Sequence, residues 1–317
     1  MYVATLRFRF TPVSPDDWQR LDDLFRASVK YGSRNHYTPA QLDAWVRRVT
    51  PERWSELLTG DLFFFLAEAV DTGEAAGFFS VSSQGYVHSL FVHPRYGRQG
   101  LGRQMLAAAE RIAVAGGARE MTAEASLTAR TLFESCGYSM RRKQDVVLDG
   151  QVLVNFCVSR PLPTVGVPQT EIRPVWKERK RFLDLLLLGD EQESAIDAYL
   201  ERGRMYQLTA GGESVGVCVV TDEAEVICEV KNLAVHPAFQ RRGYGRRLLR
   251  FAEACCRGYA RMMQVGTGES PLTLPFYERC GYKVSHRVPR FFLDHYDHPV
   301  YDGGHRLVDM IYLRKPL

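Results

Sequence analysis

The chain contains two near-copies of one short stretch, "HPRYGRQGLGRQML" at residues 93–106 and "HPAFQRRGYGRRLL" at residues 236–249. The copies share His-Pro, both glycines of a Gly-x-Gly turn, and the Arg and Leu that follow the turn. A second pair of matches, "FESCGY" ending at Tyr138 and "YERCGY" ending at Tyr282, has nearly the same spacing. A repeat of this length indicates a duplicated domain rather than a solenoid of short units.

Length and composition agree with two ordinary globular domains. A chain of 317 residues is too long for one typical core, and its content of 45% hydrophobic and 25% charged residues is average. The stretch "RPLPTVGVPQT" carries three prolines and no apolar periodicity, which is typical of a linker. We therefore predict domains at residues 1–162 and 171–317, joined by a linker at 163–170.

Charge and cysteine usage exclude several classes of protein. The net charge of +4 is spread along the chain, so we predict no nucleic-acid partner. The longest apolar run, residues 62–66, is far too short for a membrane span, and the N-terminus lacks signal-peptide features. Seven scattered cysteines without a C-x-x-C pair argue against disulfides and structural zinc. We expect a cytoplasmic protein with no membrane partner.

Four histidines lie within the aromatic stretch 286–305. Their spacing matches no common zinc pattern, and no thiolates accompany them, so no metal site is predicted. We interpret this stretch as a wall of an acceptor pocket or as a domain contact.

Each copy has the same order of expected elements. In the first copy, Ser14 and Thr38 cap two helices, and three strands follow in "LFFFLAEAV", "GFFSVSS" and "YVHSLFV". A helix from Gly100 to about residue 115, a strand near Met121, a short helix ending at Cys136 and a hairpin complete the copy. The second copy repeats this order. The fold class is thus α/β, with two tandem domains, each a mixed, mostly antiparallel twisted sheet flanked by helices.

The glycine turn follows a strand and opens a helix, which favours an anion site. Gly243 and Gly245 lack Cβ atoms, so backbone N–H groups can approach a ligand closely. These groups and the helix dipole suit a pyrophosphate. A tight turn surrounded by solvated arginines is the alternative. The sequence matches neither the P-loop pattern nor the dinucleotide-binding pattern.

The pattern Q-x-x-G-x-G after a strand, followed by "FYERCGY", resembles the GCN5-related N-acetyltransferase (GNAT) superfamily. The first copy is similar to its YafP-like branch through "YTPAQLDAW", "TAEASLTARTLFE" and "VNFCV". The second copy is similar to YvbK-like acetyltransferases through "VGTGES", "FFLDHYDHP" and "DMIYL". The resemblance implies tandem GNAT domains that use acetyl-CoA as co-substrate. It also implies an amine acceptor, on a small molecule or a protein or peptide, that attacks directly in a ternary complex.

The resemblance also assigns cofactor-binding residues. In the family, backbone groups of the strand before the loop pair with the pantetheine arm, and the loop holds the pyrophosphate. In the second copy these residues are Leu233, Ala234, Val235, Gln240, Arg241, Arg242, Gly243, Tyr244, Gly245 and Arg246. In the first copy they are Leu90, Phe91, Val92, Arg98, Gln99, Gly100, Gly102 and Arg103.

Two residues of the second copy match the family's proton-transfer positions. Glu229 fills the position of the general base, and a carboxylate there can take the proton of an ammonium group. Tyr277 matches the tyrosine that protonates the departing thiolate. The alternatives are a salt bridge between Glu229 and Lys231, which strand alternation places on one face, and a packed aromatic role for Tyr277.

The first copy lacks both groups, because Tyr86 and Phe133 stand at the positions of Glu229 and Tyr277. Its loop departs from the pattern at Gly97, so we interpret it as a degenerate acyl-CoA loop in an auxiliary domain, and the second domain as the catalyst. His88 could serve as a different base, or could be a strand residue that only packs. An acyl-CoA-binding or sensor module without turnover stays open as the alternative function. We expect the chain to be either a monomer whose two domains form a pseudo-dimer, or a homodimer.

Overall fold

The computed structural model describes residues 7–163, 170–224 and 226–317. The chain divides into two units, Met1–Pro174 and Val175–Leu317, each with its own core. The predicted linker, residues 163–170, lies almost entirely outside the described residues. The division between the units falls within strand β8 (Thr170–Val175).

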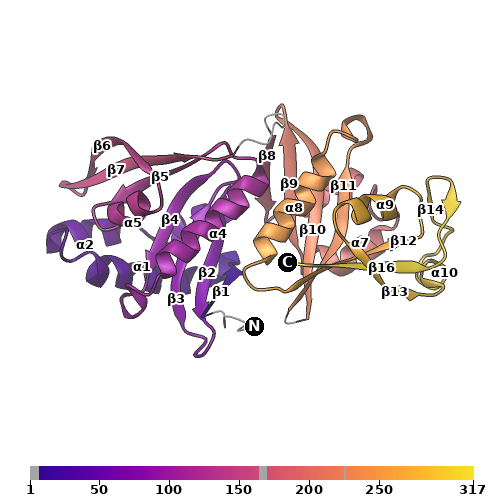
Figure 1. The fold of residues 1–317 in the computed structure, drawn as a ribbon, viewed down its shortest axis with the longest axis horizontal. Helices are drawn as coiled ribbons and strands as arrows, with labels where there is room; N and C mark the ends of the chain where they lie inside the picture. The colour runs from indigo at the N-terminus through magenta and orange to yellow at the C-terminus, as the bar shows by residue number, and fades with distance from the viewer. Residues whose placement is uncertain (1–6, 164–169, 225) are drawn as a thin grey trace. The chain divides into compact units, whose positions relative to one another are not determined.

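The first unit follows the predicted order of elements closely (Figure 1). It contains β1 (Phe8–Pro12), η1 (Pro15–Asp17), α1 (Trp18–Ala27), η2 (Ser28–Gly32), α2 (Pro39–Arg47), α3 (Pro51–Thr59), β2 (Phe63–Ala69), β3 (Ala75–Val81), β4 (Tyr86–Val92), η3 (Pro94–Tyr96), α4 (Leu101–Gly116), β5 (Glu120–Ser126), α5 (Arg130–Ser135), β6 (Ser139–Leu148) and β7 (Gln151–Pro161).

The second unit repeats this order and adds a short hairpin near its end. It contains η4 (Arg179–Phe182), α6 (Leu183–Leu186), α7 (Glu193–Leu200), β9 (Arg204–Ala210), β10 (Glu213–Ala224), β11 (Ile227–Val235), η5 (Pro237–Phe239), α8 (Tyr244–Cys256), β12 (Met262–Gly268), α9 (Thr273–Arg279), β13 (Lys283–Val288), α10 (Phe291–His295), β14 (Tyr301–Asp302), β15 (His305–Arg306) and β16 (Met310–Pro316).

Within the described residues, the two main sheets have seven strands each and the same strand order. The first runs β1-β2-β3-β4-β5-β7-β6, and the second runs β8-β9-β10-β11-β12-β16-β13. Neighbouring strands are mostly antiparallel, but β4 and β5 run parallel, as do β11 and β12. The α/β fold class with two tandem mixed sheets is confirmed.

Helices cover both faces of each sheet because alternate strand residues face opposite layers. In the first unit, Phe64 and Phe78 join a hydrophobic cluster with residues of α1, α2 and α3. Gly77, on the other face, lies against α4, where an added Cβ would be 3.3 Å from the Met105 side chain. Figure 1 shows α4 lying along β3 and β4.

The second unit has the same layering. Val217 and Val219 of β10 pack in a cluster with residues of α6 and α7. Gly216 points the other way, and an added Cβ there would lie 3.2 Å from Leu248 of α8. The crossover helices α4 and α8 therefore occupy equivalent places in the two units.

Local sequence explains where the first helices begin. The Ser14 and Thr38 side chains each form a capping box, with Asp17 and Gln41 respectively, and proline follows each cap. Helix α3 was not predicted from the sequence, although Thr50 caps it and Pro51 opens it, the same Thr-Pro pair that begins α2. No helix among the described residues is long and apolar enough to cross a membrane.

Candidate functional site

In both units the parallel strand pair separates partway along its length. Within the described residues, β4 and β5 are paired at Tyr86 and Val87, and β11 and β12 are paired from Ile227 to Val230. Beyond these points the later residues of β4 and β11 keep only the neighbour on their other side. Such backbone edges can pair with an extended ligand. They include Leu90, Phe91 and Val92 in the first unit and Leu233, Ala234 and Val235 in the second.

A β-bulge marks the point of separation in each unit. In β4 the register shifts so that His88 is the extra residue, and in β11 the extra residue is Lys231. A bulge redirects side chains and increases the local twist. The two bulged residues are therefore placed at equivalent points where the strands open.

The two glycine loops have the same backbone conformation despite their different sequences. Arg98 and Arg241 have positive φ angles of 61° and 60°, and Gly100 and Gly243, the N-cap residues of α4 and α8, have φ of 79° and 86°. Gly97 and Gln240 are both extended. The departure at Gly97 thus leaves the loop of the first unit in the same shape as that of the second.

The two glycines of each loop face different surroundings. A Cβ added at Gly243 or Gly100 would meet nothing within 4 Å. A Cβ at Gly245 would contact Phe276 of α9 at 3.5 Å, and one at Gly102 would lie 2.9 Å from Leu132 of α5. The first glycine of each loop therefore leaves open space at the helix N-terminus, whereas the second glycine lies against the short helix.

Several polar side chains of the loops bind the protein itself. Gln240 donates to the Val235 carbonyl at 3.0 Å, and Arg242 donates to the Ala238 carbonyl at 3.0 Å. In the first unit, Gln99 donates to the Arg95 carbonyl, and Arg103 donates to Ser135. These bonds fix the shape of the loop. Tyr244 is buried, whereas Arg241 and Arg246 are exposed.

Glu229 lies at the centre of a buried polar chain on β11 and β12. Its side chain is 7% exposed, and its Oε1 accepts a hydrogen bond from Lys231 Nζ at 2.8 Å. Its Oε2 accepts from Gln264 Nε2 at 2.8 Å, and Gln264 in turn accepts from Arg314 at 2.8 Å. The salt bridge weighed from the sequence is thus present. Although burial lowers the pKa of Lys231, the hydrogen bond and charge of Glu229 raise it overall.

Tyr277 lies on α9 and is buried, with its ring 5.0 Å from Phe276 and 5.9 Å from Tyr282. Burial raises the pKa of Tyr277 above its usual value, so the hydroxyl is protonated at neutral pH and able to donate. Phe133 has the equivalent place on α5, where it packs on Tyr138 at 5.0 Å. Both short helices therefore present an aromatic ring, but only the second presents a hydroxyl.

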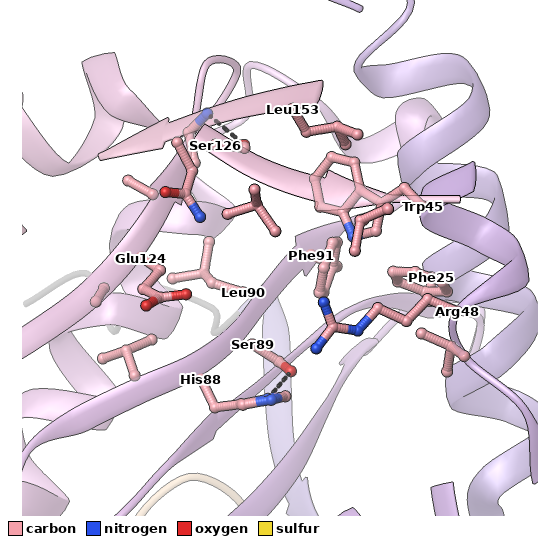
Figure 2. Close-up of a pocket in the computed structure, with 18 of the residues that line it drawn as sticks. Phe25, Trp45, Arg48, His88, Ser89, Leu90, Phe91, Glu124, Ser126 and Leu153 are labelled. Carbon is pink, nitrogen blue, oxygen red and sulfur yellow. Dashed lines mark hydrogen bonds between the residues drawn. The ribbon is translucent and has the colours of Figure 1, made fainter. Parts of the chain in front are cut away.

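The first unit contains a cavity of about 260 Å³ that opens where β4 and β5 separate. Side chains from the helical layer, Phe25, Trp45 and Arg48, line one side of it. His88 and Glu124, from the two separating strands, line the other (Figure 2). Neither this cavity nor Arg48 was predicted from the sequence, because the walls of the cavity come from segments far apart in the chain.

His88 is a weaker base than its usual pKa suggests. Burial, assisted by the charges of Arg53 and Arg48, lowers its pKa to about 4, against the opposing charge of Glu124. Its Nδ1 lies 2.8 Å from the Ser89 hydroxyl. The imidazole is therefore neutral at physiological pH.

The histidines of the C-terminal stretch do not converge. His286 stacks on Tyr312, His295 stacks on Phe291, and His298 binds Asp297 at 2.6 Å. Among the described residues, no group of three or more His, Cys, Asp or Glu could hold a metal ion. Tyr296 of the same stretch donates to Asp190 at 3.0 Å, which ties the stretch to the helical layer of the second unit.

Two acetyltransferase (GNAT) domain models match the chain, one at residues 33–159 and the other at 201–284. The chain is similar to the uncharacterized N-acetyltransferase YvbK of Bacillus subtilis (strain 168), with 36% identity over 41% of this chain and 85% of that protein. It is also similar to the uncharacterized N-acetyltransferase YafP of Escherichia coli (strain K12), with 30% identity over 45% of this chain and 88% of that protein.

A solved GNAT family acetyltransferase from Elizabethkingia anophelis, with acetyl-CoA bound, is 31% identical over 47% of this chain and 98% of that one, with a TM-score of 0.45. Each relative covers about half of this chain, as a tandem duplication requires. The chain belongs to the GNAT acetyltransferase family and carries two of its domains. The resemblance inferred from the sequence, and the enzyme class that follows from it, are confirmed.

Proposed function

We propose that the chain transfers the acetyl group of acetyl-CoA to an amine, by direct attack within a ternary complex. The observation that carries this proposal is the combination of an open strand edge with a loop of left-handed residues at a helix N-terminus, which occurs in both units. Both relatives are named as N-acetyltransferases, which favours an enzyme over a binding or sensor module. The acceptor amine belongs to a small molecule or to a protein.

The residues fit acetyl-CoA at two places. The space in front of Gly243, which any Cβ would enter, suits a pyrophosphate held by backbone N–H groups and the dipole of α8. The free edge of Leu233, Ala234 and Val235 suits the amide groups of the pantetheine arm. The equivalent residues of the first unit, Gly100 and Leu90 to Val92, fit in the same way because the backbone conformation is the same.

We propose that the second unit carries out the chemistry. Glu229 takes the ammonium proton, directly or through water, and frees the nitrogen lone pair. The nitrogen then bonds to the thioester carbonyl carbon, the carbon–sulfur bond breaks, and Tyr277 gives its proton to the departing thiolate. The acylated nitrogen releases its second proton to solvent, from which Tyr277 is reprotonated. The Tyr277 hydroxyl is protonated at neutral pH, as this role requires. The 2.8 Å ion pair with Lys231 favours a second possibility, in which Glu229 only holds the strand bulge in place.

Separate disabling of the two loops tests the assignment of the units. Gly243→Val places a branched side chain in the open space and forces it to a φ of 86°, which only glycine adopts easily. We expect it to abolish coenzyme A binding in the second unit and nearly all transfer across an amine panel. Gly100→Val is the matched change in the first unit and should leave most turnover. Loss of turnover in Gly100→Val alone, with coenzyme A bound normally by the second unit, would reverse the assignment.

A further inference from the structure

The cavity of the first unit has an aromatic wall. Phe91 of β4 lies 5.1 Å from Phe25 and 6.3 Å from Trp45 between ring centroids, and Trp45 lies 5.7 Å from Tyr37. All four rings line the cavity. Phe91 and Trp45 are only partly buried, so part of each residue is accessible. Such a wall favours a flat apolar group.

Two charged side chains of opposite sign line the same cavity. Figure 2 draws Arg48 and Glu124 on opposite sides, with Ser89 and Leu90 between them. Within the described part of the chain, neither side chain has a hydrogen bond or ion pair. Arg53, the other cation of the lining, is held by Glu56 at 2.9 Å. His88 carries no charge at neutral pH, because burial lowers its pKa to about 4.

The second unit lacks two of these groups at the equivalent places. Tyr86 pairs with Thr122, and Glu229 pairs with Gln264, so Glu124 corresponds to Gly266. In β11, Ala234 stands at the repeat position of Phe91. Glu124 and Phe91, one charged and one aromatic residue of the lining, are therefore specific to the first unit.

We propose that the first unit holds a binding site for a small aromatic amine that also carries a carboxylate, such as an aromatic α-amino acid. The ammonium group pairs with Glu124, the carboxylate pairs with Arg48, and the ring packs on Phe91 and Trp45. The site lies in the first unit, beside its open strand edge, so it adds a ligand-binding function to the chemistry proposed for the second unit. It does not rest on that chemistry, because binding is measurable without transfer.

The test uses L-phenylalanine and two analogues that each lack one charge, 2-phenylethylamine and 3-phenylpropanoate. Affinity for the full chain is measured by calorimetry and ligand-observed NMR, with coenzyme A present. We expect phenylalanine to bind at least about tenfold more tightly than either analogue, because each charge-assisted hydrogen bond contributes roughly 10–100-fold. Equal affinity for all three, or no binding of any of them at millimolar concentration, would overturn the proposal.

Two variants assign each charge to its partner. Arg48→Gln should weaken phenylalanine and 3-phenylpropanoate about tenfold and leave 2-phenylethylamine unchanged. Glu124→Gln should weaken phenylalanine and 2-phenylethylamine and leave 3-phenylpropanoate unchanged. Arg48→Lys should recover part of the loss. Arg47→Gln is the matched control, because Arg47 is the neighbouring cation but binds Asp149 at 3.2 Å and does not line the cavity.

The pattern across ligands separates binding from folding. A variant that only destabilised the unit would weaken all three ligands equally, and that result would contradict the assigned contacts. Affinities unchanged in both variants would place the ligand elsewhere and overturn the site. Selective binding supports this site whether or not phenylalanine is acetylated, because Gly243→Val tests the proposed chemistry of the second unit separately.

Discussion

Glu229→Gln is expected to slow acetyl transfer by about 10²–10⁴-fold at neutral pH, because it removes the carboxylate that takes the amine proton but keeps the shape of the side chain. The amide can still bind Gln264, which donates to Oε2 at 2.8 Å in the native chain. An amine acceptor with a pKa near 10 is almost fully protonated at pH 7. The loss should therefore shrink as the pH approaches that value and free amine accumulates.

The same substitution has a structural cost, which can be worked out separately. Removing one partner of a buried ion pair costs about 3–5 kcal/mol. Lys231 is 22% exposed and keeps Glu223 at 3.5 Å, so we expect the lower end, about 3 kcal/mol. For a unit of this size that corresponds to a fall in Tm of roughly 6–12 °C. Assays at a temperature well below the unfolding transition ensure that a loss of folded protein does not lower the measured rate.

Lys231→Met is the matched control, because it breaks the same ion pair but leaves the carboxylate in place. It should lower Tm by a comparable amount and slow the reaction much less than Glu229→Gln. The assay is a pH profile of kcat/KM from the loss of thioester absorbance, on an amine that the wild-type chain acetylates. A folded Glu229→Gln variant with the wild-type profile would refute the assignment of the base. Equal loss in both variants would show that the ion pair acts only on structure.

Three further predictions concern other residues of the two units. Tyr277→Phe should leave coenzyme A affinity unchanged and lower kcat by about tenfold or less, because a thiol of pKa about 8.5 is a fair leaving group; weaker coenzyme A binding by calorimetry would contradict this. Gly102→Val should destabilise the first unit in thermal unfolding, since its Cβ would lie 2.9 Å from Leu132, whereas Gly245→Ala should be tolerated. Burial lowers the pKa of His88 to about 4, so between pH 6.5 and 4 the unfolded chain takes up a proton that the folded chain does not. The stability contributed by neutral His88 is therefore complete above pH 6.5 and is lost as the pH falls through 4, by about 3 kcal/mol. The free energy of unfolding of His88→Asn, measured with denaturant, should lack this dependence on pH.

Much of the fold could be predicted because its signals are local. The capping residues Ser14 and Thr38, the aromatic strands and the Gly-x-Gly turn act within a few residues of chain, so their consequences can be inferred without knowledge of the rest. The repeat then indicated two domains with the same order of elements. The loop around Gly97 was interpreted as degenerate, yet its backbone matches that around Gln240. Its shape depends on the glycine and arginine at left-handed φ, not on that side chain.

The candidate sites depend on contacts between segments far apart in the chain, which local sequence signals do not reveal. The sequence by itself determined the duplication, the family, the strand that carries Glu229 and the helix that carries Tyr277. Only the tertiary structure decided that Glu229 is held by both Lys231 and Gln264, because Gln264 comes from the neighbouring parallel strand. It also decided that Arg48, Phe91 and Glu124 surround one cavity. Arg48 directly follows helix α2, and Phe91 and Glu124 come from two strands of the sheet. The fold brings these three segments together, and their spacing along the chain does not reveal it.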